Sequence, residues 1–420
     1  MSAMSEPVQA LPGALEEPTV NVRRGYIGAV FLANFGIVLA FFTPIQNLLP
    51  RLAEQADPTS KEAALAWITG AGAAASIIFN PLAGALSDRT TSRLGRRKPW
   101  VLYGSIAGAL FISALAFQST VIGLAFIWFL CQATINGSYA AVTATIPDQV
   151  PVPQRGLVSG WVGLASTLGV VVGVALVSFL VTDLKLGILL TALLLVLLCL
   201  PFVLRLKDVV LDASHRPAFH FGSWIRGFWV SPREYPDFGW AWLTRFLMML
   251  GNSMATLYLL FWLKDKVHYS NPEQGQTVLI GLYALGTMAT AVIFGRISDR
   301  SGRRKIYVIS ATIVMAVSAV ILALFPNFNA AMGAALILGL GYGMYLAVDQ
   351  ALVTQVLPTA IDRGRDLGVI NIANSAPQVL APVIAAPIVT TAMGYTGLYL
   401  LTAVITLLSA VLVLPIKSVP

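Results

Sequence analysis

Long apolar runs, separated by short charged segments, make up most of this chain of 420 residues. Each run is close to the roughly 20 residues that an α-helix needs to cross a bilayer. Twelve runs can be marked, near residues 26–50, 63–87, 99–118, 122–146, 158–181, 186–205, 238–263, 277–298, 306–325, 330–357, 367–391 and 395–416. The pattern therefore predicts an all-α membrane protein with twelve transmembrane helices.

One long polar stretch divides these runs into two sets of six. We expect a cytoplasmic tail over residues 1–25, a six-helix bundle over 26–205, a cytoplasmic linker over 206–237, a second six-helix bundle over 238–416 and a short tail over 417–420. The first tail lacks the basic and apolar regions of a cleaved signal peptide. Two bundles related as a repeat are a common architecture of secondary transporters.

Composition and charge agree with a membrane location. Charged residues make up 11% of the chain, whereas soluble domains carry about 25%. With the N-terminus inside, 21 of the 27 Lys and Arg residues fall in cytoplasmic segments and five in external ones, as the positive-inside rule requires. We therefore predict a multi-pass protein of the cytoplasmic (inner) membrane, monomeric, with both termini cytoplasmic. The net charge of +8 reflects this topology and does not indicate nucleic-acid binding.

Two loops at equivalent positions carry the same glycine, carboxylate and arginine pattern. The first reads GALSDR over 84–89 and GRRK over 95–98, and the second reads GRISDRSGRRK over 295–305. From Arg97 to Arg155 is 58 positions, and from Arg304 to Arg363 is 59. We expect the glycines to let helices approach closely, and the charged residues to latch the bundles in one conformation. The gating candidates are Gly84, Asp88, Arg96, Arg97, Gly295, Asp299, Arg303 and Arg304.

The second loop matches the G-x-x-x-D-R-x-G-R-R signature, and in this the chain resembles the major facilitator superfamily. The first loop carries four extra residues, and its sequence SDRTTSRLGRRKPW over 87–100 is similar to that of sucrose transporters and of glycoside-pentoside-hexuronide:cation symporters. That resemblance implies a sugar or glycoside as substrate and a proton or sodium ion as coupling ion. It also implies an acidic residue in the fourth span, where this chain has Gln132. A neutral amide cannot carry a proton, so either another residue couples transport or the protein is not a proton symporter.

Two ionisable residues stand well inside the predicted spans, Arg245 in the seventh and Asp349 in the tenth. Charges in the hydrocarbon region are costly and mark functional sites by default. Both residues lie roughly 11 Å from the cytoplasmic ends of their helices, at 1.5 Å per residue. We expect them to pair. The pair is either the ion-coupling element or a permanent structural salt bridge.

Amides and phenols with helical spacing surround this pair. In the superfamily, the first, fourth, seventh and tenth helices line the central cavity, which suits hydroxyl-rich ligands if the lining is neutral and polar. Such residues also serve as interhelical contacts. The substrate-binding candidates are Asn34, Gln132, Asn136, Tyr139, Asn252, Tyr342, Tyr345, Gln350, Asn371 and Asn374.

Three functions remain open: cation-coupled movement of a sugar or glycoside, proton-driven efflux of amphipathic compounds, and a non-transporting membrane sensor. A hydroxyl-rich ligand favours amides and aromatic rings, whereas efflux pumps tolerate apolar walls around a carboxylate. We expect no enzyme activity, no ATP site, no metal site and no cofactor beyond a coupling ion. The expected partners are a small solute and the lipid bilayer.

Overall fold

A computed structural model describes residues 18–215, 222, 231, 233–301, 303–356 and 363–418, and these residues form helices and connecting loops without a strand. The first half contains α1 (Arg24–Thr43), the π-helix η1 (Pro44–Leu48), α2 (Leu49–Ala56), α3 (Lys61–Ser87), α4 (Lys98–Leu115), α5 (Val121–Gln149), α6 (Val152–Ala175), the π-helix η2 (Leu176–Leu180) and α7 (Leu184–Arg205). A short 3-10 helix, η3 (Ala213–His215), follows. The second half contains α9 (Pro236–Leu257), α10 (Leu259–Asp265), α11 (Pro272–Ser301), α12 (Arg304–Leu324), α13 (Phe328–Val356), α14 (Arg363–Val389) and α15 (Gly394–Leu412).

The helices are those of a multi-pass membrane protein. Within the described residues, eleven continuous helical stretches are long and apolar enough to cross a bilayer. Three of them join consecutive elements: α1 with η1 and α2, α6 with η2, and α9 with α10. The 30-residue α11 is a further long helix and packs between α13 and the first bundle. The prediction of an all-helical membrane fold is confirmed.

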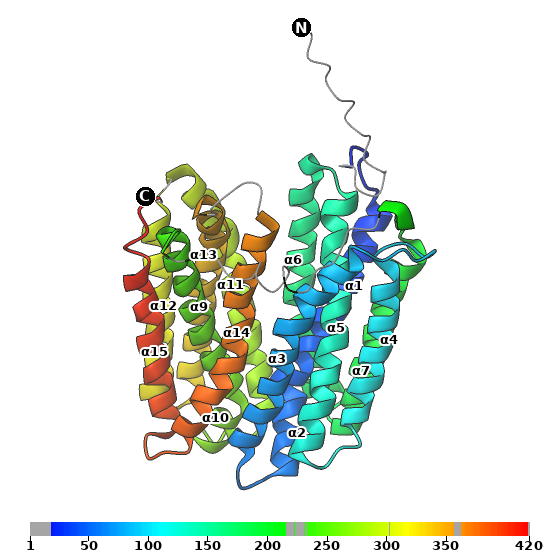
Figure 1. The fold of residues 1–420 in the computed structure, drawn as a ribbon. Helices are drawn as coiled ribbons and strands as arrows, with labels where there is room; N and C mark the ends of the chain where they lie inside the picture. Colours follow the sequence, from blue (N-terminus) through cyan, green and yellow to red (C-terminus); the bar gives the residue numbers. More distant parts are fainter. Residues whose placement is uncertain are drawn as a thin grey trace.

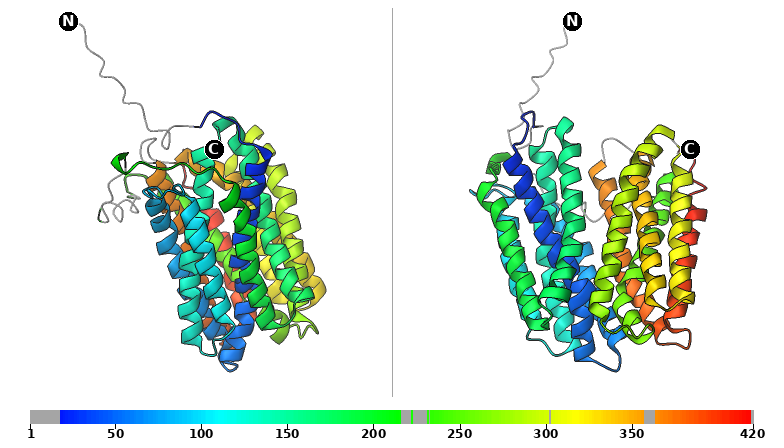
Figure 2. Two further views of the ribbon diagram at one scale, coloured as in Figure 1. Left: turned by 90° about the vertical axis from the view of Figure 1, so that its right-hand side faces the viewer. Right: turned by 180° about the vertical axis from the view of Figure 1, so that it is seen from behind.

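The helices form two bundles, α1 to α7 and α9 to α15, that stand side by side (Figure 1). Contacts between the bundles run chiefly through α3 against α14, and through α6 and η2 against α11. The ribbons converge at the end that carries α2 and α10, and diverge toward the end where both termini lie (Figure 2). We call these the closed end and the terminal end.

The first helix of each bundle is interrupted near the closed end. In the first bundle, the α-helix gives way to the π-helical turn η1, which begins at Pro44. In the second, α9 and α10 are separated by Tyr258, whose backbone (φ −99°, ψ 14°) leaves the helical region. π-helical turns occur frequently at functional sites. In both bundles the interruption separates a long helix from a short one, α2 or α10.

Small residues bring α11 and α13 into backbone contact in the second bundle. A Cβ atom on Gly339 would lie 2.1 Å from the carbonyl oxygen of Tyr283, and one on Gly343 would lie 2.2 Å from that of Thr287. Such distances leave no room for any side chain. Close approach through small residues is typical of helix pairs in membranes, and here it fixes the position of Tyr283.

Candidate functional site

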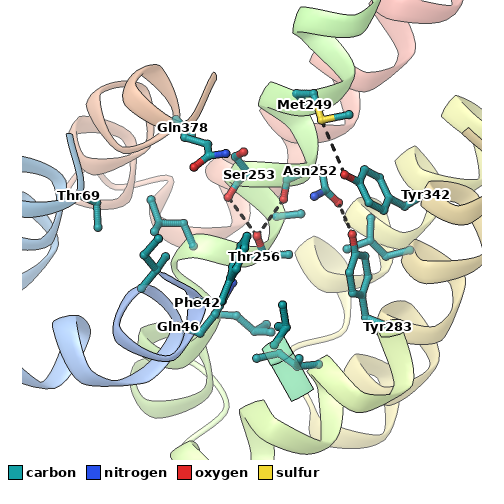
Figure 3. Close-up of a pocket in the computed structure, with 18 of the residues that line it drawn as sticks. Phe42, Gln46, Thr69, Met249, Asn252, Ser253, Thr256, Tyr283, Tyr342 and Gln378 are labelled. Atoms are coloured by element: carbon teal, nitrogen blue, oxygen red, sulfur yellow. Dashed lines mark hydrogen bonds between the residues drawn. The ribbon is translucent and has the colours of Figure 1, made fainter. Parts of the chain in front are cut away.

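A cavity of about 300 Å³ lies between the two bundles and is lined by both of them. Of its 27 lining residues, fourteen are aliphatic side chains or methionine, and the other thirteen carry amides, hydroxyls or aromatic rings. From the first bundle these are Phe42, Gln46, Thr69, Ser76, Trp128 and Gln132; from the second they are Asn252, Ser253, Thr256, Tyr283, Tyr342, Asn374 and Gln378. Every described residue that lines this cavity is uncharged. Figure 3 labels ten of the lining residues, from α1, η1, α3, α9, α11, α13 and α14, which face a common space.

The wall formed by α9, α11 and α13 is ordered by hydrogen bonds and ring stacking. Tyr283 donates its hydroxyl to Oδ1 of Asn252 at 3.2 Å, and Thr256 donates to the Asn252 carbonyl at 3.0 Å. The rings of Tyr283 and Tyr342 stack with their centroids 5.7 Å apart. Stacked phenols next to an amide present apolar ring faces beside polar edges to the cavity.

A neutral polar cluster stands on the first-bundle side, between α3 and α5. Nδ2 of Asn136 lies 2.9 Å from Oγ of Ser76 and 3.1 Å from Oε1 of Gln132, and Asn80 donates to Asn136 at 3.3 Å. Gln132 and Ser76 reach the cavity, whereas Asn136 lies behind them. This cluster contains amides and a hydroxyl and no carboxylate, so it offers hydrogen bonds but carries no charge.

Arg245 and Asp349 form an ion pair, as their equal depth in the predicted membrane spans suggests. Nη1 of Arg245 lies 2.5 Å from Oδ2 of Asp349, and both side chains are about 95% buried. The contact joins opposite charges without the angles of a hydrogen bond. Tyr345 donates to the other carboxylate oxygen at 2.7 Å, and Nε of Arg245 donates to Oδ1 of Asn374 at 2.7 Å. Since Asn374 lines the cavity, it connects the pair to the cavity wall.

Other substrate-binding candidates occupy different places. Asn34 is buried within the first bundle, where it donates to the Val162 carbonyl at 3.0 Å and to Ser166 at 2.7 Å. Tyr139 packs edge-on against Phe41. Neither these two residues nor Tyr345 and Asn136 are among the cavity-lining residues. The side chains of Gln350 and Asn371 lie outside the described residues.

The arginines of the first loop motif bind carboxylates of their own bundle. Oδ2 of Asp148 lies 2.8 Å from both Nη2 of Arg96 and Nε of Arg97, and Arg97 also contacts Asp88 and Ser87 at 2.5 Å. Although burial lowers the pKa of the Arg97 guanidinium, the Asp148 and Asp88 carboxylates raise it above its ordinary value. The guanidinium therefore keeps its charge and ties the loop to the end of α5.

The close helix approach expected at Gly84 is absent among the described residues in this conformation. A Cβ atom on Gly84 would meet nothing within 4 Å, so the glycine does not mediate a close helix contact here. The bundles diverge toward this terminal end (Figure 2). In the second motif, Arg303 is exposed and Arg304 is partly buried; the side chains of Gly295 and Asp299 lie outside the described residues.

The start of the linker is anchored to the same loop. Oδ2 of Asp208 accepts from the backbone N–H groups of Arg97 and Lys98 at the start of α4, where the helix dipole favours a negative charge. Gly95 has φ +103°, and a Cβ atom there would lie 2.4 Å from the Asp208 side chain. Only glycine fits both the left-handed backbone and the approach of this carboxylate.

At the closed end, a network of charged and phenolic residues joins the two bundles. Nζ of Lys61 lies 2.7 Å from Oδ1 of Asp265, and Nζ of Lys264 lies 2.6 Å from Oε1 of Glu54. The Tyr395 hydroxyl lies 3.1 Å from Oε1 of Glu62 and 2.9 Å from Oδ2 of Asp265. We call these residues the inter-bundle network: Glu54, Lys61, Glu62, Lys264, Asp265 and Tyr395.

A second contact between the bundles lies next to the cavity. Nε2 of Gln276 on α11 is 3.4 Å from Oε1 of Gln46 in η1. Gln46 lines the cavity, so this amide pair lies at the cavity wall. Sequence reasoning singled out neither the network nor Gln46, Trp128 and Tyr283 of the cavity. The acidic and basic residues in and next to the short helices α2 and α10 are the sequence feature that could have indicated the network.

The comparisons with known proteins agree with the fold. The family model of the Major Facilitator Superfamily matches residues 26–278 and 241–420. The chain therefore belongs to the major facilitator superfamily, whose members are membrane transporters. It superposes on a mutant of the nucleoside transporter NupG with a TM-score of 0.75 (11% identity, 93% of this chain and 100% of that one). For the human organic anion transporter MFSD10 (TETRAN) the TM-score is 0.68 (19% identity, 93% and 99% covered).

Two curated proteins match parts of the sequence. A general alpha-glucoside permease of Schizosaccharomyces pombe is 31% identical over 123 residues, and an uncharacterized symporter of Synechocystis is 40% identical over 83 residues. These segments cover 26% and 16% of this chain, and 22% and 15% of the two relatives. The aligned part thus spans less than a quarter of either relative.

Proposed function

We propose that this protein moves a sugar or glycoside across the membrane together with a cation, by alternating access. The observation that carries the proposal is the polar part of the cavity lining: amides, hydroxyls and stacked aromatic rings set among apolar side chains, with every described lining residue uncharged. A polyhydroxylated ligand needs many neutral donors and acceptors, and an unpaired polar group buried on either side costs free energy. The partial similarity to an alpha-glucoside permease supports the same substrate class.

The cation acts at Asp349 in this proposal. The cluster of Ser76, Gln132 and Asn136 is neutral, so it cannot exchange a proton near neutral pH. Asp349 is a buried carboxylate whose partner, Arg245, also contacts the cavity-lining Asn374. Buried carboxylates and arginines in transport proteins mark ion or substrate pathways by default. We therefore assign coupling to this pair and favour a proton as the coupling ion.

The conformation has its cavity closed on one side by the inter-bundle network. With both termini in the cytoplasm, as the distribution of Lys and Arg predicts, the closed end faces outward and the structure represents an inward-facing state. On this assignment the inter-bundle network is the external gate. The cluster of Arg96, Arg97 and Asp148 lies at the cytoplasmic end, where it is available to contact the second bundle when the terminal end closes.

The test is uptake into proteoliposomes that contain the purified full chain. Radiolabelled sucrose and maltose are offered with and without an inward proton gradient, and protein-free liposomes provide the background. We expect accumulation above equilibrium only with the gradient. Transport of an amphipathic dye or an organic anion, with no uptake of either sugar, would instead support the efflux alternative and reject the proposed substrate class.

A further inference from the structure

The guanidinium of Arg245 is shared between two partners from different helices. Its Nη1 contacts Oδ2 of Asp349 on α13 at 2.5 Å, and its Nε donates to Oδ1 of Asn374 on α14 at 2.7 Å. Asn374 lines the cavity, whereas Arg245 and Asp349 do not. A ligand in the cavity can therefore contact Asn374 directly, and it can influence the ion pair through this amide.

We propose that Asn374 is the positioning residue that links ligand binding in the cavity to protonation of Asp349. This inference rests on the proposed function and adds how substrate and proton bind together. The side-chain amide has two ends with different roles. Its Oδ1 holds Arg245, and its Nδ2 has no hydrogen-bond partner within the described part of the chain, so it can donate to a hydroxyl oxygen of a ligand.

The direction of the coupling follows from hydrogen-bond cooperativity. When Nδ2 donates to a ligand oxygen, the amide becomes more polarised and Oδ1 becomes a stronger acceptor, by roughly 10–30% per bond. The contact from Arg245 to Asn374 then strengthens at the expense of its contact to Asp349. A less neutralised buried carboxylate takes up a proton more readily, because an uncompensated charge in a buried site is costly.

Protonation of Asp349 forms one O–H bond and requires no other reactant. A proton from solvent adds to a carboxylate oxygen of Asp349, forms the O–H bond of a neutral carboxylic acid, and ends the ion-pair contact. Arg245 stays protonated throughout, since guanidinium groups do not lose their proton in proteins. Its charge is then stabilised by Oδ1 of Asn374, which the bound ligand has polarised. Ligand and proton therefore favour each other, and the linkage must be reciprocal.

In the part of the chain that the structure describes, few other groups that titrate lie near Asp349. On α13 itself, Tyr345 donates to Oδ1 of Asp349, and Tyr342 lies one turn earlier. From α9 comes Arg245, and from α11 comes Tyr283, which stacks on Tyr342. Among the described residues, α12 and α14 bring no charged group to the carboxylate. A proton that binds with the ligand is therefore assigned to Asp349.

The same helix provides a matched control. Gln378 lies one turn after Asn374 on α14 and lines the same cavity, but no hydrogen bond joins it to Arg245 among the described residues. If Asn374 were only a ligand contact, replacing either amide would weaken binding in the same way. Under the proposal, only Asn374 also carries the pH dependence.

The experiment measures binding of radiolabelled sucrose and maltose to the purified full chain between about pH 5.5 and 8. Wild-type affinity should rise as pH falls, toward the limit of about tenfold per pH unit for one linked proton. Asn374→Leu, which keeps the branched shape of the side chain without its polar atoms, should bind more weakly and show no pH dependence. Gln378→Leu should bind more weakly but retain the wild-type slope, and Asn374→Ala provides a second variant if the leucine variant does not fold.

Each result bears on the inference. A wild-type pH slope that is lost in the Asn374 variants and kept in Gln378→Leu supports it. The same slope in all variants overturns it and leaves Asn374 as a ligand contact. Wild-type sugar binding that does not vary with pH overturns the inference while leaving the proposed substrate class intact, and absence of sugar binding at every pH overturns both.

Discussion

Lys61 and Asp265 are 204 positions apart in the chain and meet across the two bundles, with Nζ 2.7 Å from Oδ1. Their side chains are 13% and 31% exposed, so solvent screens the pair and its contribution is about 1 kcal/mol or less. Several weak contacts of this kind, together with the Glu54–Lys264 pair and the Tyr395 hydrogen bonds, can hold the bundles together and still separate during transport. This is the property that an alternating-access gate requires.

A cross-link at this position should stop transport. We expect the Lys61→Cys, Asp265→Cys double variant, treated with a short bifunctional thiol reagent, to lose sugar uptake because the closed end can no longer open. A reducible reagent should allow recovery. The native Cys131 and Cys199 are buried, so background reaction should be small, and the two single variants serve as controls. Uptake at the wild-type rate by a fully cross-linked protein would show that this end does not need to open.

Loss of the Arg97 guanidinium should destabilise the first bundle. Arg97 is 2% exposed and contacts Asp148, Asp88 and Ser87. Arg97→Ala leaves the two carboxylates without this partner, and removing one member of a buried pair costs about 3–5 kcal/mol. Because Asp88 is half exposed, we expect about 3 kcal/mol, seen as a lower apparent Tm in detergent. The exposed Arg93→Ala in the same loop is the control; an equal effect of both substitutions would contradict the assignment.

Two glycines of α13 should respond differently to the same substitution. In Gly339→Ala the new methyl group would collide with the Tyr283 backbone at 2.1 Å, whereas in Gly333→Ala nothing lies within 4 Å. The first substitution must push α11 away and displace Tyr283 from the cavity wall. We expect a KM for sugar uptake raised severalfold and a lower Tm for Gly339→Ala, and wild-type values for Gly333→Ala. A normal KM in a folded Gly339→Ala protein would exclude Tyr283 from the binding wall.

Gln132 and Asn34 were equivalent candidates by sequence and are not equivalent in the structure. Gln132 lines the cavity, whereas Asn34 binds Val162 and Ser166 within the first bundle. Gln132→Leu should raise KM because the cavity wall then lacks a side chain that can hydrogen-bond to the ligand. The loss of such a bond costs on the order of 1 kcal/mol or more. Asn34→Ala should lower thermal stability and leave KM unchanged. The reverse pattern in uptake kinetics would contradict this assignment of the cavity.

Much of the fold follows from the sequence because hydrocarbon imposes simple rules. Apolar runs of sufficient length must be helical to satisfy their backbone groups, and the twelve predicted runs correspond to the long helices. The contact between Arg245 and Asp349 could be predicted from the sequence for the same reason, because two isolated charges at equal depth in the membrane have few other partners.

The cavity and the gate depend on side-chain positions that periodicity does not determine. Gln46 and Tyr283 reach the cavity because η1 and the α11–α13 glycines set their placement, and neither effect is visible in a hydropathy pattern. Asn34 satisfies the same sequence pattern as Asn252, yet only one of them faces the cavity. The inter-bundle network joins residues up to 333 positions apart, such as Glu62 and Tyr395, whose proximity requires the assembled bundles.

The most direct test of sugar–proton coupling through Asp349 is sugar-driven proton entry. Proteoliposomes with a trapped pH-sensitive dye and no imposed gradient receive sucrose or maltose from outside. We predict acidification of the lumen with the wild-type chain, and none with Asp349→Asn, although that variant should still exchange labelled sugar by counterflow. Sugar entry without acidification in the wild type, or equal acidification with Asp349→Asn, would contradict the account.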